Sequence, residues 1–366
     1  MPRRSYVEMV LSLASNKPLK GRGALSNGQS RYLATTSEWL EEEAAEETCH
    51  KPPTELIIDK AKSIIATNSS PDVPFDQSVN PYKGCEHGCI YCFARPTHAY
   101  WDLSPGLDFE TKIFYKPNGP ELLERAIDKP NYICKPLAFG TNTDPYQPID
   151  QQLQITRQLL QVLQRFRHPF SLVTKGSHVL RDLDIFADMA ADNLCSVRIT
   201  ITTLSNDLKR TLEPRAASAR TRLEAVKVLH EHKVPVGILM APVIPMINDM
   251  EIEQILEASA AAGARSANHL FIRLPLEVRD LFYEWLHAHF PERAKHVISL
   301  IRQSREGADY TSEFGTRMRG NGVFAELIAH RFAVTCKRFG LTQARESELT
   351  RDLFIRPSEY SQLSLF

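Results

Sequence analysis

The feature that most constrains the fold is an alternation of short apolar runs with helical stripes from residue 80 onward. Five runs rich in apolar and β-branched residues are typical of strands: Leu137–Gly140, Ser171–Thr174, Val197–Thr202, Val236–Ala241 and His269–Leu274. Apolar residues at helical spacing follow each run, as Ile155, Leu159 and Val162 follow the first. Such alternation indicates a parallel sheet buried on both faces.

A sixth unit contains a group of cysteines, so we expect six βα units. Six are too few for a closed eight-stranded barrel, and they predict an α/β fold with an open, partial (β/α)6 barrel of the TIM type. The 366-residue chain would then comprise an N-terminal arm over residues 1–52, the barrel over residues 53–290, and a helical C-terminal cap and tail over residues 291–366.

The expected arm is basic and glycine-rich at Lys20–Gly28 and acidic at Glu38–Glu47. Segments of this composition bury little apolar surface, so they are mobile or draped over a larger body. Alternatively, Gly21, Arg22 and Gly23 close over a ligand site or contact a phosphate.

Composition excludes several function classes. The 44 lysines and arginines balance 44 aspartates and glutamates, so no broad basic field draws the chain to nucleic acid or to an anionic membrane. A local basic patch stays possible, as at Arg317 and Arg319 in a glycine-rich loop. No apolar run approaches the ~20 residues of a membrane span, and the seven cysteines fit a reducing compartment. The sequence therefore favours a cytoplasmic protein without a membrane segment.

Three of the seven cysteines, Cys85, Cys89 and Cys92, have the spacing Cys-x3-Cys-x2-Cys. Three thiolates can each bind one iron of a cubane [4Fe–4S] cluster and leave the fourth iron open to an exogenous chelating ligand. Gly84 and Gly88 allow the tight backbone that such a loop requires.

Two other metal sites compete with this interpretation. A structural zinc site needs four ligands, usually from two separated Cys-x2-Cys pairs, and no second pair exists. A conventional four-cysteine cluster would need a ligand that the expected strands place far away, namely Cys134, Cys195 or Cys336. The spacing favours the cluster with an open iron.

With Tyr91 before the third cysteine, this motif resembles that of the radical SAM superfamily. Its context is most similar to the bacterial subgroup related to spore photoproduct lyase. The segments that carry this likeness are Cys85–Cys92, Gly140–Pro148, Leu212–Arg215 and Ala241–Pro245, and the resemblance spans about residues 75–290. It implies a (β/α)6 partial barrel with the cluster in the loop after the first strand.

The resemblance also implies an activity. In this family, S-adenosylmethionine (SAM) chelates the open iron through its amine and carboxylate. One electron, from a low-potential donor such as flavodoxin or ferredoxin, then cleaves SAM to methionine and a 5′-deoxyadenosyl radical that abstracts hydrogen from the substrate. The substrate here is unidentified, and nucleic acid is one possibility. The alternative is a non-catalytic iron–sulfur sensor or nucleic-acid-binding module.

The resemblance assigns roles to individual residues. Cys85, Cys89 and Cys92 match the iron ligands and count as the catalytic and metal-binding set, and Tyr91 matches a residue that approaches the adenine. The remaining SAM contacts are Thr141, Asn142 and Thr143 for the methionyl amine, Lys175 for its carboxylate, Thr200 and Thr202 for the ribose, and Met240 and Pro242 for the adenine. Lys175 could instead be an exposed loop lysine, and the two strand threonines could serve packing.

One departure from the subgroup concerns hydrogen-atom donation. Spore photoproduct lyase uses a cysteine after the second strand to donate hydrogen to the product radical, whereas this chain has Thr141 there. A hydroxyl is a poor hydrogen-atom donor, and Cys134 and Cys195 precede their strands, so repair by that mechanism is in doubt. Tyr100 and Tyr146 could relay a radical or could serve packing.

Three further residues carry open alternatives. Glu213 and Arg215 flank a proline and form either an ion-paired turn or substrate ligands. Asp144, at the expected mouth of the barrel, either binds substrate or caps its own loop.

Overall fold

The computed structural model describes residues 18–32, 53–343 and 349–357. Within these residues the strands form two sheets: a large one of seven strands and a small one of three. The expected boundaries at residues 52 and 290 stay predictions.

The large sheet has the strand order β10-β9-β8-β7-β6-β3-β2. Six of its strands are parallel, and only β2 at the edge runs antiparallel to its neighbour β3. Their bounds are β2 Ile65–Thr67, β3 Gln77–Val79, β6 Leu137–Phe139, β7 Phe170–Thr174, β8 Cys195–Thr200, β9 Val236–Val243 and β10 Ser266–Phe271. The sheet ends at β10 and β2 without closing, so the open six-unit barrel is confirmed.

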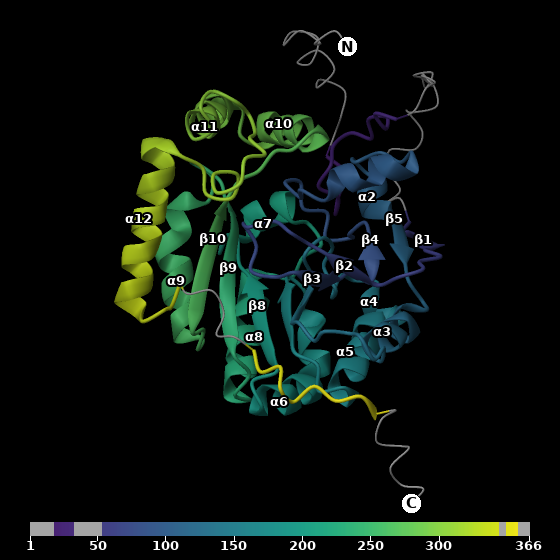
Figure 1. Ribbon diagram of the computed structural model, residues 1–366. Helices are drawn as coiled ribbons and strands as arrows, with labels where there is room; N and C mark the ends of the chain where they lie inside the picture. The colour runs from purple at the N-terminus through teal and green to yellow at the C-terminus, as the bar shows by residue number, and fades with distance from the viewer. Residues whose placement is uncertain (1–17, 33–52, 344–348, 358–366) are drawn as a thin grey trace, which may run out of the picture.

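Helices cover the outer side of this sheet (Figure 1). Their apolar residues pack against the strands, as Leu159, Leu163 and Phe186 do, and these side chains are fully buried. The bounds are α3 Gly119–Ile127, α4 Asp150–Leu153, α5 Ile155–Arg165, α6 Leu183–Ala191, α7 Asn206–Leu212, α8 Ala219–Glu231 and α9 Ile252–Ala261. Short 3-10 helices occupy η1 Arg95–Trp101, η2 Ser177–Asp182 and η3 Asp249–Glu251.

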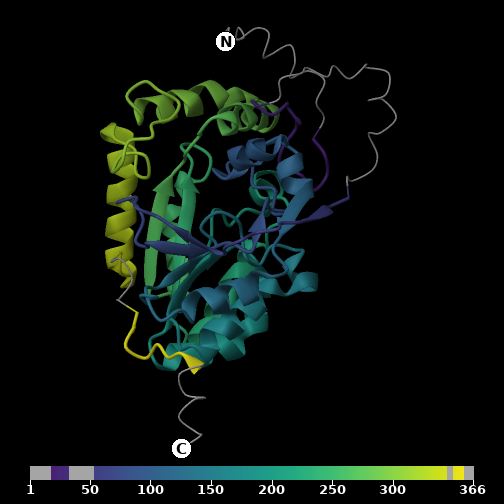
Figure 2. The same cartoon turned by 45° about the vertical axis from the view of Figure 1, so that its right-hand side comes forward.

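The small sheet lies to one side of the barrel, as the turned view shows (Figure 2). Its central strand β5, Lys112–Tyr115, pairs in parallel with β1, Glu55–Ile58, and antiparallel with β4, Tyr82–Lys83. Helix α2, Asp108–Thr111, leads directly into β5. This sheet supports the cysteine loop, because Cys85 follows β4 by two residues and donates its amide to the carbonyl of Phe109 (2.9 Å).

Three helices follow the last strand: α10 Glu277–His289, α11 Pro291–Gln303 and α12 Gly322–Phe339. Figure 1 shows α10 and α11 across the upper end of the barrel and α12 beside α9. The loop before α12 reaches back to the β2–β3 turn, where the Gly315 amide and the Arg317 guanidinium both bond Asp72. Arg317, one of the two arginines of the local basic patch considered in the sequence, is thus paired within the chain.

Residues 18–32, which we name the strap, lie against the cysteine loop. The Gly23 and Ala24 amides donate to the buried Glu110 carboxylate (3.0 and 2.9 Å), which also accepts from Arg95 (2.5 Å). A Cβ on Gly23 would lie 1.8 Å from the carbonyl oxygen of Gly88, so only glycine fits there. This part of the expected arm is therefore draped over the body of the protein, while the acidic run at residues 38–47 lies outside the described residues.

None of the helices in the described ranges is both long enough and apolar enough to cross a membrane.

Candidate active site

A cavity opens at the carboxyl ends of the parallel strands, where barrel folds place their sites. Each of β6 to β10 contributes residues from its end or from the segment that follows it. The lining comprises Cys85, His87, Cys89, Tyr91, Cys92, Phe93, Gly140, Thr141, Asn142, Thr143, Asp144, Val173, Thr174, Lys175, Thr200, Leu239, Ala241, Pro242, Leu270, Phe271 and Arg273. Ten of the twelve predicted site residues therefore lie on one cavity.

The cysteine loop brings its three thiols to this cavity in a tight, turn-rich conformation. The amide of Cys92 bonds the carbonyl of Cys89 (3.2 Å), and that of Gly88 bonds the carbonyl of Cys85 (3.3 Å). Gly84 and Gly88 both have positive φ, as expected for a loop that folds back on itself. Burial raises the pKa of all three thiols, that of Cys89 to about 12, so they need a metal to become thiolates.

The arrangement of the thiols discriminates between metal sites. Across the part of the chain that the structure describes, no three histidine, cysteine or carboxylate side chains converge on a single metal ion. A zinc ion would require such convergence, whereas in a cubane cluster each thiolate binds a different iron. The three thiols line one cavity, which fits a cluster in which each thiolate would bind a different iron.

The turn after β6 is held rigidly against the start of the cysteine segment. The backbone amide of Asn142 donates to Asn80 Oδ1 (3.1 Å), and the Thr143 hydroxyl donates to the carbonyl of Tyr82 (2.9 Å). Gly140 has a φ of 76°, and a Cβ there would lie 2.0 Å from the carbonyl oxygen of Val173 on the neighbouring strand. The turn can therefore run close to β7 and present Thr141 and Asn142 to the cavity.

Asp144 ends this turn and fastens it to the segment after β7. Its carboxylate accepts the Thr174 hydroxyl (2.6 Å) and the Lys175 amide (2.7 Å), and His87 Nδ1 lies 3.3 Å away. Burial opposes the charge, but His87 and these hydrogen bonds outweigh it and hold the Asp144 pKa at about 2. The geometry shows Asp144 capping its own loop, which was one of its two expected roles.

Lys175 lines the cavity beside Tyr91, with its Nζ 5.8 Å from the centre of the tyrosine ring. Among the described residues its ammonium group forms no ion pair or hydrogen bond that would fix it within the chain. A cation that lines a cavity without a direct ion pair, beside the Tyr91 ring and within electrostatic reach of Glu213, is suited to bind a carboxylate that enters from solvent.

Glu213 holds Tyr91 in place from behind. The Tyr91 hydroxyl donates to Glu213, which also accepts from Arg222 Nη2 (2.5 Å). Burial opposes ionisation of Glu213, but Arg222, Lys175 and Tyr91 together keep its pKa at about 2. Glu213 is therefore one half of a buried ion pair, and Arg215 pairs with a different residue, Glu86 (2.9 Å).

Two of the predicted SAM contacts do not line the cavity. Met240 is fully buried between Leu239 and Ala241, which do line it, because side chains alternate across the sheet and Met240 takes the opposite face. Thr202 lies beyond Thr200, the last residue of β8, and its carbonyl accepts Asn248 Nδ2 (2.8 Å). The alternation of side chains along β8 could not predict the position of the Thr202 side chain, because the strand ends at Thr200.

The lining residues that sequence reasoning missed include Phe93 and Arg273. Phe93 directly follows the third cysteine, and Arg273 lies two residues beyond β10. A signal for Arg273 was available, because a polar residue at the carboxyl end of a barrel strand points to function. The expected end of that strand at residue 274 placed Arg273 inside the strand instead.

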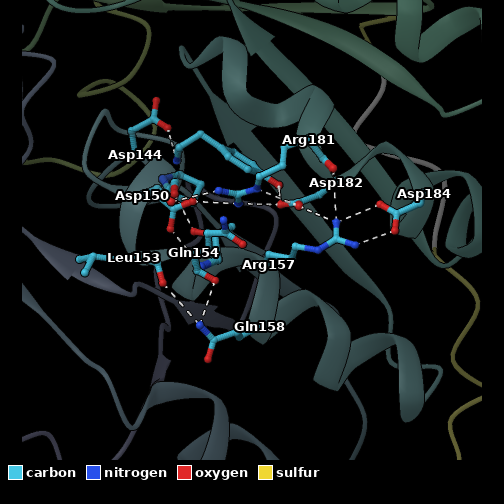
Figure 3. A network of polar contacts seen from close by, with 12 residues as sticks. Asp144, Asp150, Leu153, Gln154, Arg157, Gln158, Arg181, Asp182 and Asp184 are labelled. Atoms are coloured by element: carbon cyan, nitrogen blue, oxygen red, sulfur yellow. Dashed lines mark hydrogen bonds and ion pairs between the residues drawn. The ribbon is translucent and has the colours of Figure 1, made fainter.

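A network of ion pairs lies behind the turn that follows β6 (Figure 3). Arg181 bonds Asp150 and Asp182 (2.9 Å each), and Arg157 bonds Asp182 (2.8 Å) and Asp184 (2.7 Å). Tyr146 is fully buried and donates its hydroxyl to Asp182 (2.7 Å). It does not line the cavity, so this geometry gives it a packing role.

Comparisons with known proteins support the fold and the motif. The family model of the Radical SAM superfamily matches residues 79–258. An uncharacterized protein of Mycobacterium bovis is 33% identical over 233 residues, which cover 63% of this chain and 68% of that protein. An uncharacterized protein of Methanocaldococcus jannaschii is 29% identical over 197 residues, 54% of this chain and 71% of that protein.

Among solved structures, spore photoproduct lyase complexed with dinucleoside spore photoproduct superposes with a TM-score of 0.57 at 14% identity. The match covers 78% of this chain and 80% of that one. A double mutant of the lyase with bound AdoMet and dinucleoside spore photoproduct gives a TM-score of 0.55. At this identity the likeness shows the fold alone. Together with the family model and the cysteine loop, it leads to one conclusion: the chain belongs to the radical SAM superfamily.

Proposed function

We propose that this chain is an enzyme that holds a [4Fe–4S] cluster on Cys85, Cys89 and Cys92 and uses it to cleave SAM reductively. Membership of the superfamily implies both the cluster and SAM. The observation that carries the proposal is one cavity lined by the three thiols, by the turn after β6 and by Lys175. When bound, cluster and SAM supply a 5′-deoxyadenosyl radical for hydrogen abstraction.

The residues of the chain would divide the binding of SAM among them. Lys175 would pair with the methionyl carboxylate, and Thr141, Asn142 and Thr143 would bind the methionyl amine. Tyr91, Thr200 and Pro242 would contact the adenosyl part. Glu213 would act through Tyr91, because it fixes the ring whose face lies beside Lys175.

The strap and the buried arginine Arg95 would protect the cluster loop from water. Arg95 is fully buried and donates from Nε to the carbonyl of Cys89 (2.9 Å), while the strap packs on Gly88. The electron would come from a low-potential donor such as flavodoxin or ferredoxin. The substrate class, with nucleic acid as one candidate, is not set by these residues, since Thr141 stands where the lyase has its hydrogen donor.

The test is anaerobic reconstitution with iron and sulfide, followed by reduction in the presence of SAM. We expect about four irons and four sulfides per chain, and formation of 5′-deoxyadenosine. Cys89→Ala should lose cluster and product, whereas Cys134→Ala, at a cysteine outside the cavity, should keep both.

Equal product from the wild type and Cys89→Ala would contradict the proposal. A full cluster with no cleavage of SAM would also contradict it, and would favour the alternative of a non-catalytic iron–sulfur module.

A further inference from the structure

Arg273 lines the cavity on the side of β10, and among the described residues its charge has no carboxylate partner in an ion pair. Its Nη1 donates to the thioether sulfur of Met318 (3.4 Å) and its Nη2 donates to the Tyr310 hydroxyl (3.5 Å), and both of these acceptors are neutral. Its Nε is buried without a hydrogen-bond partner. Within the described ranges no carboxylate forms an ion pair with it, in contrast to most arginines around the barrel.

The nearest buried cation, Arg305, adds positive charge to the surroundings of Arg273. Arg305 is buried behind it and donates to the carbonyls of Ile272 and Thr316 (2.8 Å each), and within the described ranges it forms no ion pair with a carboxylate. Burial and the neighbouring charge of Arg273 lower the pKa of Arg305 to about 10. Asp72 lies within electrostatic reach, but its oxygens are taken by the Gly315 amide (2.6 Å) and by Arg317.

An exposed aromatic ring stands next to this cation. The guanidinium carbon of Arg273 lies 5.1 Å from the centre of the Phe93 ring. Phe93 is 45% exposed although it lines the cavity beside the third cysteine. The wall therefore presents a positive charge and an apolar ring side by side, within the space where hydrogen abstraction would take place.

A guanidinium whose acceptors are neutral and whose buried Nε has no hydrogen bond gains stability when an anionic ligand binds it. Its planar fork matches the two oxygens of a phosphate or a carboxylate. Lys175, on the strand-β7 side, already suits the carboxylate of SAM, so a second cation implies a second anion. An aromatic wall beside it suits a flat, apolar group.

We propose that Arg273 and Phe93 form a substrate subsite that binds an anionic group, phosphate or carboxylate, attached to a planar ring. The inference rests on the proposed function, because it places this anion beside the bound SAM. It makes Arg273 a determinant of substrate choice and assigns Phe93 to the ring of the substrate.

Binding of small probes to the reconstituted, SAM-loaded protein tests the subsite by titration calorimetry under anaerobic conditions. Phenyl phosphate and benzoate carry the two candidate anions on a ring, benzyl alcohol is their neutral counterpart, and inorganic phosphate lacks the ring. We expect at least one anionic ring compound to bind the wild type at least tenfold more tightly than benzyl alcohol. The anion that binds more tightly identifies whether the substrate carries a phosphate or a carboxylate.

Variants separate the two halves of the subsite. Arg273→Gln should weaken the anionic probes at least tenfold, and Arg273→Lys should weaken them less, because lysine keeps the charge and loses the fork. Phe93→Leu should weaken the ring compounds and leave the affinity for inorganic phosphate unchanged. Arg279→Gln removes a nearby exposed arginine that does not line the cavity, and it should leave all affinities unchanged.

Several results would overturn the subsite. These are equal binding of neutral and anionic probes, no saturable binding of either anion, or an equal loss in Arg273→Gln and Arg279→Gln. A loss of SAM affinity in Arg273→Gln without a loss of probe affinity would assign the arginine to the cofactor instead. Thermal unfolding of each variant checks that it is folded. The iron content and 5′-deoxyadenosine yield of the wild type without probes decide the proposed function separately.

Discussion

Lys175 and Arg181 lie six residues apart after the same strand, yet only Arg181 forms ion pairs with carboxylates of the described residues. Arg181 belongs to the paired network of Asp150, Arg157, Asp182 and Asp184, in which every charge has a partner within the chain (Figure 3). Lys175, like Arg273, reaches the cavity wall, where no carboxylate of the described residues pairs with it. The fold neutralises the charges that hold its loops and leaves the cations of the cavity for ligands.

Breaking the paired network should have the largest effect on stability. In Arg181→Met the fully buried Asp150 carboxylate loses its ion-pair partner, and the fully buried Asp182 keeps only Arg157. Leaving buried charges unpaired costs about 3–5 kcal/mol, and we expect that loss in the free energy of unfolding by denaturant titration. Arg210→Met, at an exposed pair with Asp207, is the control and should change stability by less than about 0.5 kcal/mol. Similar losses of unfolding free energy in Arg181→Met and Arg210→Met would contradict the view that the buried network stabilises the fold more than an exposed pair does.

Removing an unpaired cation should lower the affinity for SAM and change the free energy of unfolding only a little. Lys175→Met breaks no ion pair, so the free energy of unfolding should fall by less than about 1 kcal/mol. The affinity of the reconstituted protein for SAM should fall about tenfold or more, equivalent to about 1.4 kcal/mol, because the carboxylate loses its counter-charge. Calorimetric titration of SAM measures this. A large loss of stability with unchanged SAM affinity would place Lys175 among the structural charges.

Tyr146→Phe sharpens the comparison inside the network. Asp182 loses one hydrogen bond and keeps Arg157 and Arg181, so the expected cost is about 1 kcal/mol. The variant should still form 5′-deoxyadenosine, since the tyrosine does not line the cavity. Full stability with abolished turnover would instead support a radical relay through Tyr146.

Asp184→Asn should have the smallest effect. Its carboxylate is 63% exposed, unlike the buried Asp182 that shares Arg157 with it. Exposed pairs contribute up to about 1 kcal/mol and are screened by salt, so the difference from the wild type should shrink as salt increases. A loss as large as that of Arg181→Met, insensitive to salt, would show that burial does not set the energetics of this network.

The sequence predicted most of the barrel because its parallel strands are apolar on both faces. Four of the five expected strands match the observed ones within two residues, and the last is shifted by three, from 269–274 to 266–271. The small sheet escaped prediction, because β1 and β5 are four residues each and pair across more than fifty residues of chain. No local pattern reveals such a pairing.

The sequence predicted the site residues that belong to a motif of fixed spacing. It missed those whose role depends on the residues packed beside them in the fold. The cysteine motif identified three lining residues, and the resemblance to a known family supplied seven more. Phe93 and Arg273 carry no motif, and their importance emerges only from an exposed ring beside an unbonded guanidinium. The buried ion pairs Arg222–Glu213 and Arg95–Glu110 could not be predicted either, because neither residue of such a pair reveals its partner in the sequence.

The contact between Gly23 and Gly88 has a practical consequence for cutting the chain. The matched family region begins at residue 79, so a fragment that starts there is the minimal unit that the family match alone suggests. Such a fragment lacks the Gly23 and Ala24 amides, so the buried Glu110 carboxylate would lose two of its three donors and open to solvent at the back of the cysteine loop. The smallest useful version of this protein must keep residues 18–32, because part of the wall behind its metal site is encoded some sixty residues upstream of it.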